Sequence, residues 1–494
     1  MRSAAARLTS WASRTAGWMG LLTGGLLLGW ARAEPPIMLP PPRVVTAPAT
    51  LPAARPQAAQ PPELSPIPLT AALALALDQN PRLRRAAAAV DQAQALEEAA
   101  FAPFLPEVGL LTRAGLTTGN LSPGAPGPTG AIIGLRDTRH LFTQAELDLQ
   151  WMLYDFGRTQ GRHREAIART RVASLKLVRA RQAVALDVCA AYLRGLQAST
   201  VITTQLEAIR RAESALHDAK ARRRAGVVET NDVLRAEVQL ADARDAYVVS
   251  IQQQQAALAE LNHVLGRDAS LPVRLQYLPE RAAFTTSLEE CLHAALGGRP
   301  EVSIARETIL AAHAGRDVAA ADLCPRVYLR GSLGQVEGDN IRTGNQQGAA
   351  IHIDMPLYAG GRFRAALRAA DAVVQEAVAS ARGIFDTITL EVTLAHQEVT
   401  AAQRRVELAR PAVEQGRENL RRLTSRYRNG DATPTDLVDA EAALTRTEQR
   451  LVATRYEYLL ALARLEFAVG GAPSSFLGET VPAVSPTPAP RPVP

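Results

Sequence analysis

Hydrophobic and polar residues alternate along several short segments of the chain, most regularly from Leu141 to Leu153. Leu, Thr, Ala and Trp side chains fall on one face of this segment, and Gln, Glu and Asp side chains on the other. A period of two residues is typical of a β-strand with one buried face. Three further segments share the pattern, so the sequence predicts four strands in two hairpins, at 107–153 and 326–357.

Long helical segments separate and follow the hairpins. The Ala-rich segment 69–102 is predicted to be one helix that ends before Pro103. Two segments, 157–225 and 361–429, are each 69 residues long and contain no Gly-Pro cluster. Each is predicted to be one continuous helix, which at this length spans about 100 Å. Apolar residues recur there at three- and four-residue spacing, as in a coiled-coil seam. Pro411 lies inside the second of these segments, where we expect a bend.

Glycines end both long helical segments. Gly226 and Gly430 follow them directly, and we expect a chain reversal at each, with glycine adopting a positive φ. A second helix of about 36 residues is predicted after each reversal, ending near Gly266 and Gly470. The chain therefore has two long helical hairpins as well as two β-hairpins.

The folded part of the chain is an internal duplication. The segment from Pro68 to Ala86 aligns with that from Ser287 to Ala305 at an offset of 219 residues. From the matching sequences LYDFGR and LYAGGR onward, the offset is 204 residues. Each copy has the order helix, strand, strand, long helix, helix, which defines a first repeat at 69–286 and a second at 287–472.

The difference between the two offsets is explained by a loop. The sequence LSPGAPGPTG at 121–130 has no counterpart in the second repeat and is expected to lie at a hairpin tip. In the second repeat, GDNIRTGNQQG at 338–348 is interpreted as the corresponding external loop.

Both ends of the chain have distinct compositions. Residues 1–33 combine an Arg-containing start, an apolar stretch and Ala31-Arg32-Ala33, which predicts a cleaved signal peptide; an uncleaved anchor is the alternative. A Pro-rich N-terminal arm at 34–68 and a Pro-rich C-terminal tail at 473–494 contain too few apolar residues to fold. The chain is therefore expected to be exported.

Charge and motifs exclude several function classes. The net charge of +6 falls to about +2 when the four arginines of the signal peptide are removed, so no nucleic-acid partner is expected. Three cysteines do not make a disulfide framework and lack the spacing of a metal site. No HExxH, GxSxG or phosphate-binding loop is present, so the sequence predicts neither an enzyme nor a cofactor or metal.

The amphipathic strands leave two interpretations open. An antiparallel sheet with one apolar face either covers a soluble core or forms the wall of a membrane barrel. Two observations favour the barrel. The polar faces of the strands carry charged residues, and the helices are already engaged in coiled coils, so no helix layer remains to cover the apolar faces. Four strands cannot close one, so several chains must contribute, and three is the smallest number we consider.

The duplicated motifs resemble the TolC family of outer-membrane efflux channels. They are A-x-x-x-A-L-x-x-N-P at 72–81, the F-x-P-x-L-P-like segment at 101–106, L-Y-x-x-G-R at Leu153 and Leu357, and the G-x-x-x-x-x-D turns. The resemblance covers 69–472. It implies a mainly α-helical homotrimer, with a twelve-stranded β-barrel among outer-membrane lipids and a long periplasmic barrel of helices. It also implies docking to a periplasmic adaptor and, through it, to an inner-membrane pump of RND or ABC type.

The resemblance also implies a channel constriction. Asp436 and Asp439 match the acidic positions that ring the narrow end, and Asp232 and Tyr427 match members of the gate's polar network. The arginine that the family pattern has four residues before Asp436 is Ala432 here, and Arg426 or Arg428 is the candidate replacement. Carboxylates gathered around one axis are expected to raise one another's pKa and attract cations. The alternative is that such carboxylates simply favour a helix start.

The turns match the tips that meet the adaptor in the family. These positions are Gly226, Val227, Thr230, Gly430, Thr433 and Thr435. The predicted function is a trimeric outer-membrane exit channel of a tripartite efflux or type I secretion system. The alternatives are a periplasmic coiled-coil adaptor of the membrane fusion type and a structural scaffold.

Overall fold

The computed structural model describes residues 66–118, 139–226, 228–279, 281, 283–338, 341–429 and 431–471. Residues 64–494 form one unit, and the description concerns that unit alone. The predicted signal peptide, almost all of the Pro-rich arm, the loop at 121–130 and the C-terminal tail lie outside the described residues.

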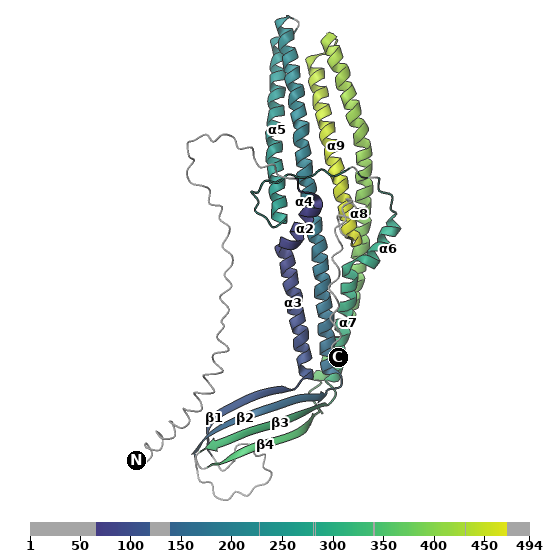
Figure 1. Cartoon of the computed structure of the whole chain (residues 1–494). Helices are drawn as coiled ribbons and strands as arrows, with labels where there is room; N and C mark the ends of the chain where they lie inside the picture. The colour runs from purple at the N-terminus through teal and green to yellow at the C-terminus, as the bar shows by residue number, and fades with distance from the viewer. Residues whose placement is uncertain are drawn as a thin grey trace, which may run out of the picture. The chain divides into compact units, whose positions relative to one another are not determined.

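Four antiparallel strands form a single sheet in the order β1-β2-β3-β4 (Figure 1). Their bounds are β1 Glu107–Thr118, β2 Arg139–Tyr154, β3 Arg326–Gly338 and β4 Ile341–Asp354. The register repeats between the hairpins, because Glu107 faces Gln150 in the first and Arg326 faces Asp354 at the same positions in the second. The predicted loop at 338–348 is wrong, since residues from Ile341 onward pair with β3 as strand β4.

One face of the sheet is apolar and open. Leu110, Leu147 and Leu333 lie side by side across β1, β2 and β3 by the strand register, and each is about half exposed. Further along the same face, Ile351 and Ile353 of β4 lie opposite Leu329 and Val327 of β3, at 65% and 70% exposure. The opposite face, offset by one residue along each strand, carries the polar side chains Glu146, Asp148, Gln150, Arg330, His352 and Asp354.

The helix predicted at 69–102 is in fact two helices, α2 Leu69–Gln79 and α3 Pro81–Phe101. Asn80 separates them with an extended backbone, at φ −67° and ψ 125°. A proline disfavours the helical conformation of the residue before it, and the Asn80 side chain accepts a hydrogen bond from the Arg82 amide. A short 3-10 helix, η1 Ala102–Phe104, leads from α3 to β1.

The second repeat has the same break. Arg299 is extended in front of Pro300, between α6 Leu288–Gly298 and α7 Pro300–Ala321. The break therefore belongs to the duplicated unit rather than to one of its copies.

The long helices agree closely with the prediction. They are α4 Arg158–Arg224 and α8 Arg362–Asn429, and they are followed by α5 Thr230–Val264 and α9 Pro434–Val469 (Figure 1). Helix α8 continues through Pro411. None of the described helices combines the length and the apolarity that a membrane crossing requires.

Two large apolar cores hold the helices together, and a small third cluster around Ala219 and Val233 lies between α4 and α5 near their turn. The first core cluster joins α2, α4 and the end of α5 to Tyr456, Leu459 and Ala463 of α9. In this cluster, the hydroxyl group of the fully buried Tyr192 donates a hydrogen bond that is shared by the backbone carbonyls of Ile67 and Gln276, at 2.9 and 2.7 Å. The second core cluster takes its buried residues from α6, α8 and α9.

Candidate functional site

The predicted site residues lie in the turns of the two helical hairpins or in the helix ends next to them. Each turn lies at the end of a helix of nearly 70 residues that starts beside the sheet, so about 100 Å of helix separates the turns from the strands. Gly226 has φ +75°, as predicted, and its amide donates to the Arg223 carbonyl at 3.0 Å. Val227 and Gly430 lie outside the described residues.

Asp436 forms a capping box at the start of α9. Its Oδ2 accepts hydrogen bonds from the Thr433 amide and hydroxyl at 2.9 and 2.7 Å, while Thr433 Oγ1 accepts from the Asp436 amide at 3.2 Å. These bonds, from the hydroxyl first and then the amide, lower the pKa of Asp436 because they stabilise its charged form. Within one chain, the carboxylate therefore acts as a helix cap, which is the alternative that the sequence left open.

The other two predicted acids differ in their surroundings. Asp439 is exposed on α9, one turn after Asp436. Asp232 is half-buried in the first turn of α5 and is close enough to Tyr427 for its charge to contribute to the raised pKa of that phenol. The charge of Asp232 thus acts on Tyr427, whereas Asp436 forms hydrogen bonds with the turn residue Thr433.

Tyr427 links the end of α8 to the end of α4. Its side chain is only 4% exposed, and burial is the main cause of its raised pKa. The Arg222 guanidinium lies 4.1 Å from the centre of its ring and donates a hydrogen bond to its backbone carbonyl. A cation against an aromatic face is worth about 0.5–2 kcal/mol, depending on its exposure. Arg222 was not among the residues predicted from the sequence.

The two arginines proposed to replace the missing one have different partners. Arg426 Nη2 donates to the Asp431 carbonyl at 3.0 Å, and its charge contributes to the lowered pKa of Asp436. Arg428 lies 3.8 Å from Asp218 of α4, both partly exposed. Of the two arginines, Arg426 is therefore the one whose charge affects Asp436. Arg428 instead links α8 to α4 through Asp218.

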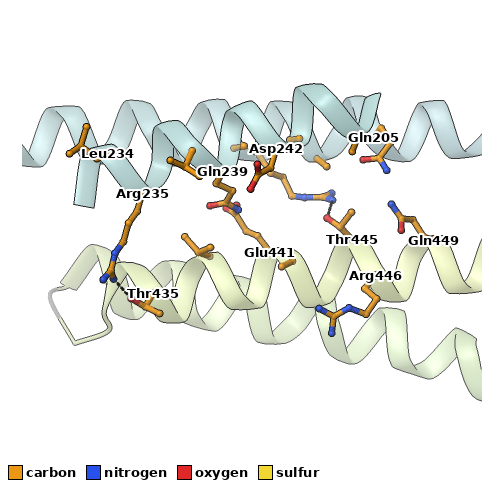
Figure 2. A pocket seen from close by; sticks show the side chains of 18 of the residues that line it. Gln205, Leu234, Arg235, Gln239, Asp242, Thr435, Glu441, Thr445, Arg446 and Gln449 are labelled. Carbon is orange, nitrogen blue, oxygen red and sulfur yellow. Dashed lines mark hydrogen bonds between the residues drawn. The ribbon is translucent and has the colours of Figure 1, made fainter. Parts of the chain in front are cut away.

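The predicted tip residues include three described threonines. Thr230 is the first residue of α5, and Thr433 is the N-cap of α9. Thr435 Oγ1 accepts a hydrogen bond from Arg235 Nη1 at 2.6 Å, so it joins α9 to α5 within the chain (Figure 2).

Behind the tips, a groove of about 740 Å³ runs between the two helical hairpins (Figure 2). Its apolar lining includes Leu234, Val238 and Val438, and its polar lining includes Arg235, Gln239 and Glu441. Gln239 Nε2 donates to Glu441 Oε2 at 2.6 Å across the groove. The helical hairpins are thus joined here by polar side chains rather than by an apolar seam.

Three acids on α9 are buried and were missed by the sequence analysis: Glu466, 3% exposed, lies near the far end of the helix, and the other two lie nearer the turn. Glu441 is 7% exposed and Glu448 is 8% exposed, and Arg211 of α4 binds Glu448 at 3.1 Å. Burial raises the pKa of Glu441, while the hydrogen bond from Gln239 and the charge of Arg211 oppose the rise. Glu441 lies four residues after Leu437, and Glu448 lies four residues after Leu444. An apolar residue is expected at such positions of a helical seam, so this spacing could have identified both acids from the sequence.

This arrangement suits a mechanical role. Among the described residues, no three His, Cys, Asp or Glu side chains gather closely enough to hold a metal ion. Near the turns, the helical hairpins are joined by hydrogen bonds and ion pairs, which water can replace, and by the stacking of Arg222 on Tyr427. Separating the hairpins near the turns therefore breaks mainly polar contacts, because the two large core clusters lie further along the helices.

Comparisons with known proteins agree with this architecture. The family model described as outer membrane efflux protein matches residues 72–267 and 291–471. Protein CyaE of Bordetella pertussis is 30% identical over 321 residues, which cover 63% of this chain and 65% of that protein. The alkaline protease secretion protein AprF of Pseudomonas aeruginosa is 28% identical over 256 residues, 48% of this chain and 49% of that protein. The chain thus spans less than two thirds of the length of these two relatives.

A solved structure shares the fold. The outer-membrane channel OprN matches with a TM-score of 0.71 and 24% identity, over 82% of this chain and 90% of that chain. The family model covers each repeat separately and leaves out the connection between them. The chain belongs to the outer membrane efflux protein family.

Proposed function

We propose that the chain is an outer-membrane exit channel through which an efflux or type I secretion system releases its cargo. The observation that carries this proposal is the sheet, which has an exposed apolar face, a polar opposite face and two long helical hairpins leading away from it. Family membership and the similarity to the secretion protein AprF support it.

The exposed apolar face suits contact with lipid. Isoleucines that are 65% and 70% exposed are unfavourable in water, at roughly 25 cal/mol per Å² of apolar surface. In a barrel wall these side chains face lipid tails, while Asp148, Arg330 and His352 face a water-filled interior. Because four strands cannot close a barrel, the proposed channel is a homotrimer of twelve strands.

The helices form the periplasmic part of the proposed channel. Twelve long helices from three chains surround a duct whose narrow end carries Asp436, Asp439, Asp232 and Tyr427. The turns, at Gly226, Val227, Thr230, Gly430, Thr433 and Thr435, meet a periplasmic adaptor that connects the channel to an inner-membrane pump. Residues 1–33 direct the export of the chain and are then cleaved.

Membrane fractionation tests this proposal. The full chain is expected in the outer-membrane fraction, to resist extraction by high salt, and to yield a species of three chains in detergent. Recovery as a periplasmic monomer would contradict the channel and favour a scaffold or adaptor role.

A further inference from the structure

Positive side chains recur on one face of α4, in the part of the helix that starts beside the sheet (Figure 1). Arg162, Arg169 and Lys176 are spaced by seven residues, which is close to two helical turns, so they lie on one face about 10 Å apart along the axis. Arg85 belongs to α3, which packs against α4. All four side chains are exposed, and we call them the cation row.

The positive charge of the cation row is only partly neutralised. Arg169 forms an ion pair with Glu165, which lies one turn before it on α4. Among the described residues, Arg85, Arg162 and Lys176 have no ion-pair partner. Each chain therefore presents three uncompensated cations on the same side of two adjoining helices.

The cation row lies along a broad groove of about 930 Å³. Residues of α3, α4, α7 and α8 line this groove, and Arg85, Arg169 and Lys176 are among them. Because α4 packs between α3 and α7, and α7 packs on α8, a groove that all four helices line lies on the concave side of their row. Alanine is the commonest residue of the lining, so the long charged side chains project beyond the wall.

The other charged residues of the groove add no further excess of positive charge. Arg316 of α7 is paired with Asp371 of α8 at 2.7 Å. Glu376 of α8 is the remaining acid of the lining. The excess of positive charge therefore belongs to α3 and α4, in the first repeat.

The cation row continues the polar face of the sheet. Arg326 faces Asp354 on that polar face and lies 3.8 Å from Asp322. The carboxylate of Asp322 also forms an ion pair with Arg158, which lies one turn before Arg162 on α4. The polar face of the sheet and the cation row thus lie on the same side of the chain. In the proposed channel, this side encloses the water-filled duct.

The spacing of the row favours a polymer over a small anion. Charges about 10 Å apart in salt are screened from one another, so a small anion interacts with only one of them at a time. An extended polypeptide rises about 3.3 Å per residue, so carboxylates about three residues apart match the spacing of the row. Several weak contacts within one molecule add up, while each is weak enough to let the chain move on.

We propose that the cation row lines the duct and guides an unfolded, acidic polypeptide as the cargo of the channel. Arg85, Arg162 and Lys176 bind carboxylates of the moving chain in turn, and three chains supply three rows around the axis. The cargo meets the row only after it has passed the acids of the narrow end, about 70 Å away along α4. This inference rests on the proposed channel and names the chemical class of its cargo.

Binding of charged polypeptides to the purified full-length protein tests the cation row. The probes are fluorescent poly-L-glutamate and poly-L-lysine of equal length, and fluorescence anisotropy at low salt gives their affinities. Arg162→Gln with Lys176→Gln removes two uncompensated cations per chain and should weaken poly-L-glutamate binding about tenfold. Binding of poly-L-lysine should not weaken, because the variant removes only positive charge.

Arg164→Gln with Arg171→Gln is the matched control. Each of these arginines lies two residues after a member of the cation row, and therefore about 200° further around α4. Both are exposed, and their ion pairs with α7 are long, at 3.8 and 3.6 Å. The control removes the same charge from the opposite face and should change poly-L-glutamate affinity by less than about twofold.

Membrane fractionation and native mass determination of each variant separate the possible failures. An outer-membrane trimer whose poly-L-glutamate affinity is unchanged in the row variant, or falls equally in the control, would overturn the cation row and leave the channel standing. Equal competition by free glutamate, at the same concentration of carboxylate, would show that the row retains single anions and would overturn the polypeptide cargo. A species that remains monomeric after extraction would overturn both proposals.

Discussion

The guanidinium of Arg222 stacks on the ring of Tyr427, 4.1 Å from its centre, and so joins the end of α4 to the end of α8. The same guanidinium donates a hydrogen bond to the Tyr427 carbonyl. The contact lies within a few residues of both turns, close to the ion pair between Arg428 and Asp218. In the proposed channel, we expect this contact to help hold the narrow end closed.

Removing this link is expected to open the narrow end. Arg222→Leu keeps the aliphatic packing and removes the stacking and the hydrogen bond, so single-channel conductance should rise about twofold or more if the bond closes the gate. The control is Arg223→Leu, which removes a neighbouring exposed arginine of the same charge. Equal conductance in both variants would show that Arg222 has no role in closing the narrow end.

The acids after the second turn are expected to set ion selectivity. Asp436→Asn with Asp439→Asn removes two charges per chain, while the asparagine side-chain oxygen can still accept the bonds from Thr433. Cation preference and block by divalent ions should both weaken in planar bilayers. Selectivity equal to that of the parent would place these residues away from the constriction.

The pH dependence of the Asp436 cap has a definite sign. Because hydrogen bonds from Thr433 lower the pKa of Asp436, its contribution to helix stability is complete above the ordinary aspartate pKa. The contribution is lost as the pH falls through the lowered value. NMR titration of this carboxyl group should therefore give a midpoint below 3.8, and a midpoint above that value in the assembled channel would show that repulsion between chains outweighs the cap.

Glu441→Gln is expected to stabilise the packed helical hairpins at neutral pH. Burial raises the pKa of Glu441, so its stabilising contribution is present at acid pH and is lost as the pH rises through that raised value. Gln239 Oε1 is buried without a hydrogen-bond partner among the described residues, and a glutamine amide at 441 can donate to it. The gain in melting temperature over the parent should grow as the pH rises from about 4 to 7.

The internal duplication provides the control for this variant. Glu237 is the counterpart of Glu441 in the first repeat, but it is far more exposed and pairs with Lys220 at 2.8 Å. Glu237→Gln should therefore show no gain that grows with pH. A similar gain in both variants would mean that net charge, rather than burial at Glu441, is responsible.

The junction between the sheet and the helices depends on a buried arginine. Arg158 is 4% exposed, forms an ion pair with Asp322, and has a pKa lowered mainly by burial. Asp322→Asn should lower the free energy of unfolding by roughly 3 kcal/mol, because a buried charge loses its partner. Asp317→Asn, which breaks the half-exposed pair with Arg164, should cost less than about 1 kcal/mol. Thermal denaturation of the two variants under the same conditions makes the comparison.

Much of the fold was predictable because periodicity persists over long segments. Alternation placed the strands to within a few residues, and uninterrupted helical patterns placed α4 and α8 to within one residue at each end. The break at Asn80 was missed because the Ala-rich segment continues on both sides of it, although Asn followed by Pro was the signal. The sequence at 338–348 was taken for a loop because Gly, Asn and Gln are typical of turns, whereas pairing with β3 makes most of it a strand.

The site was less predictable than the fold. Family resemblance indicated Asp232, Asp436 and Tyr427, but their partners depend on which helices meet, and no local pattern encodes that. Arg222 is one of three consecutive arginines, and only its contact with Tyr427 of α8 distinguishes it from the other two. The buried acids Glu441 and Glu448 depend in the same way on Gln239 and Arg211, which come from the other hairpin.

The most direct test of the trimeric exit channel is single-channel conductance of the detergent-extracted protein in a planar bilayer, with native mass determination of the same sample. The account predicts a species of three chains that gives steady, small, cation-selective openings. A monomer or dimer that produces no conductance would contradict it.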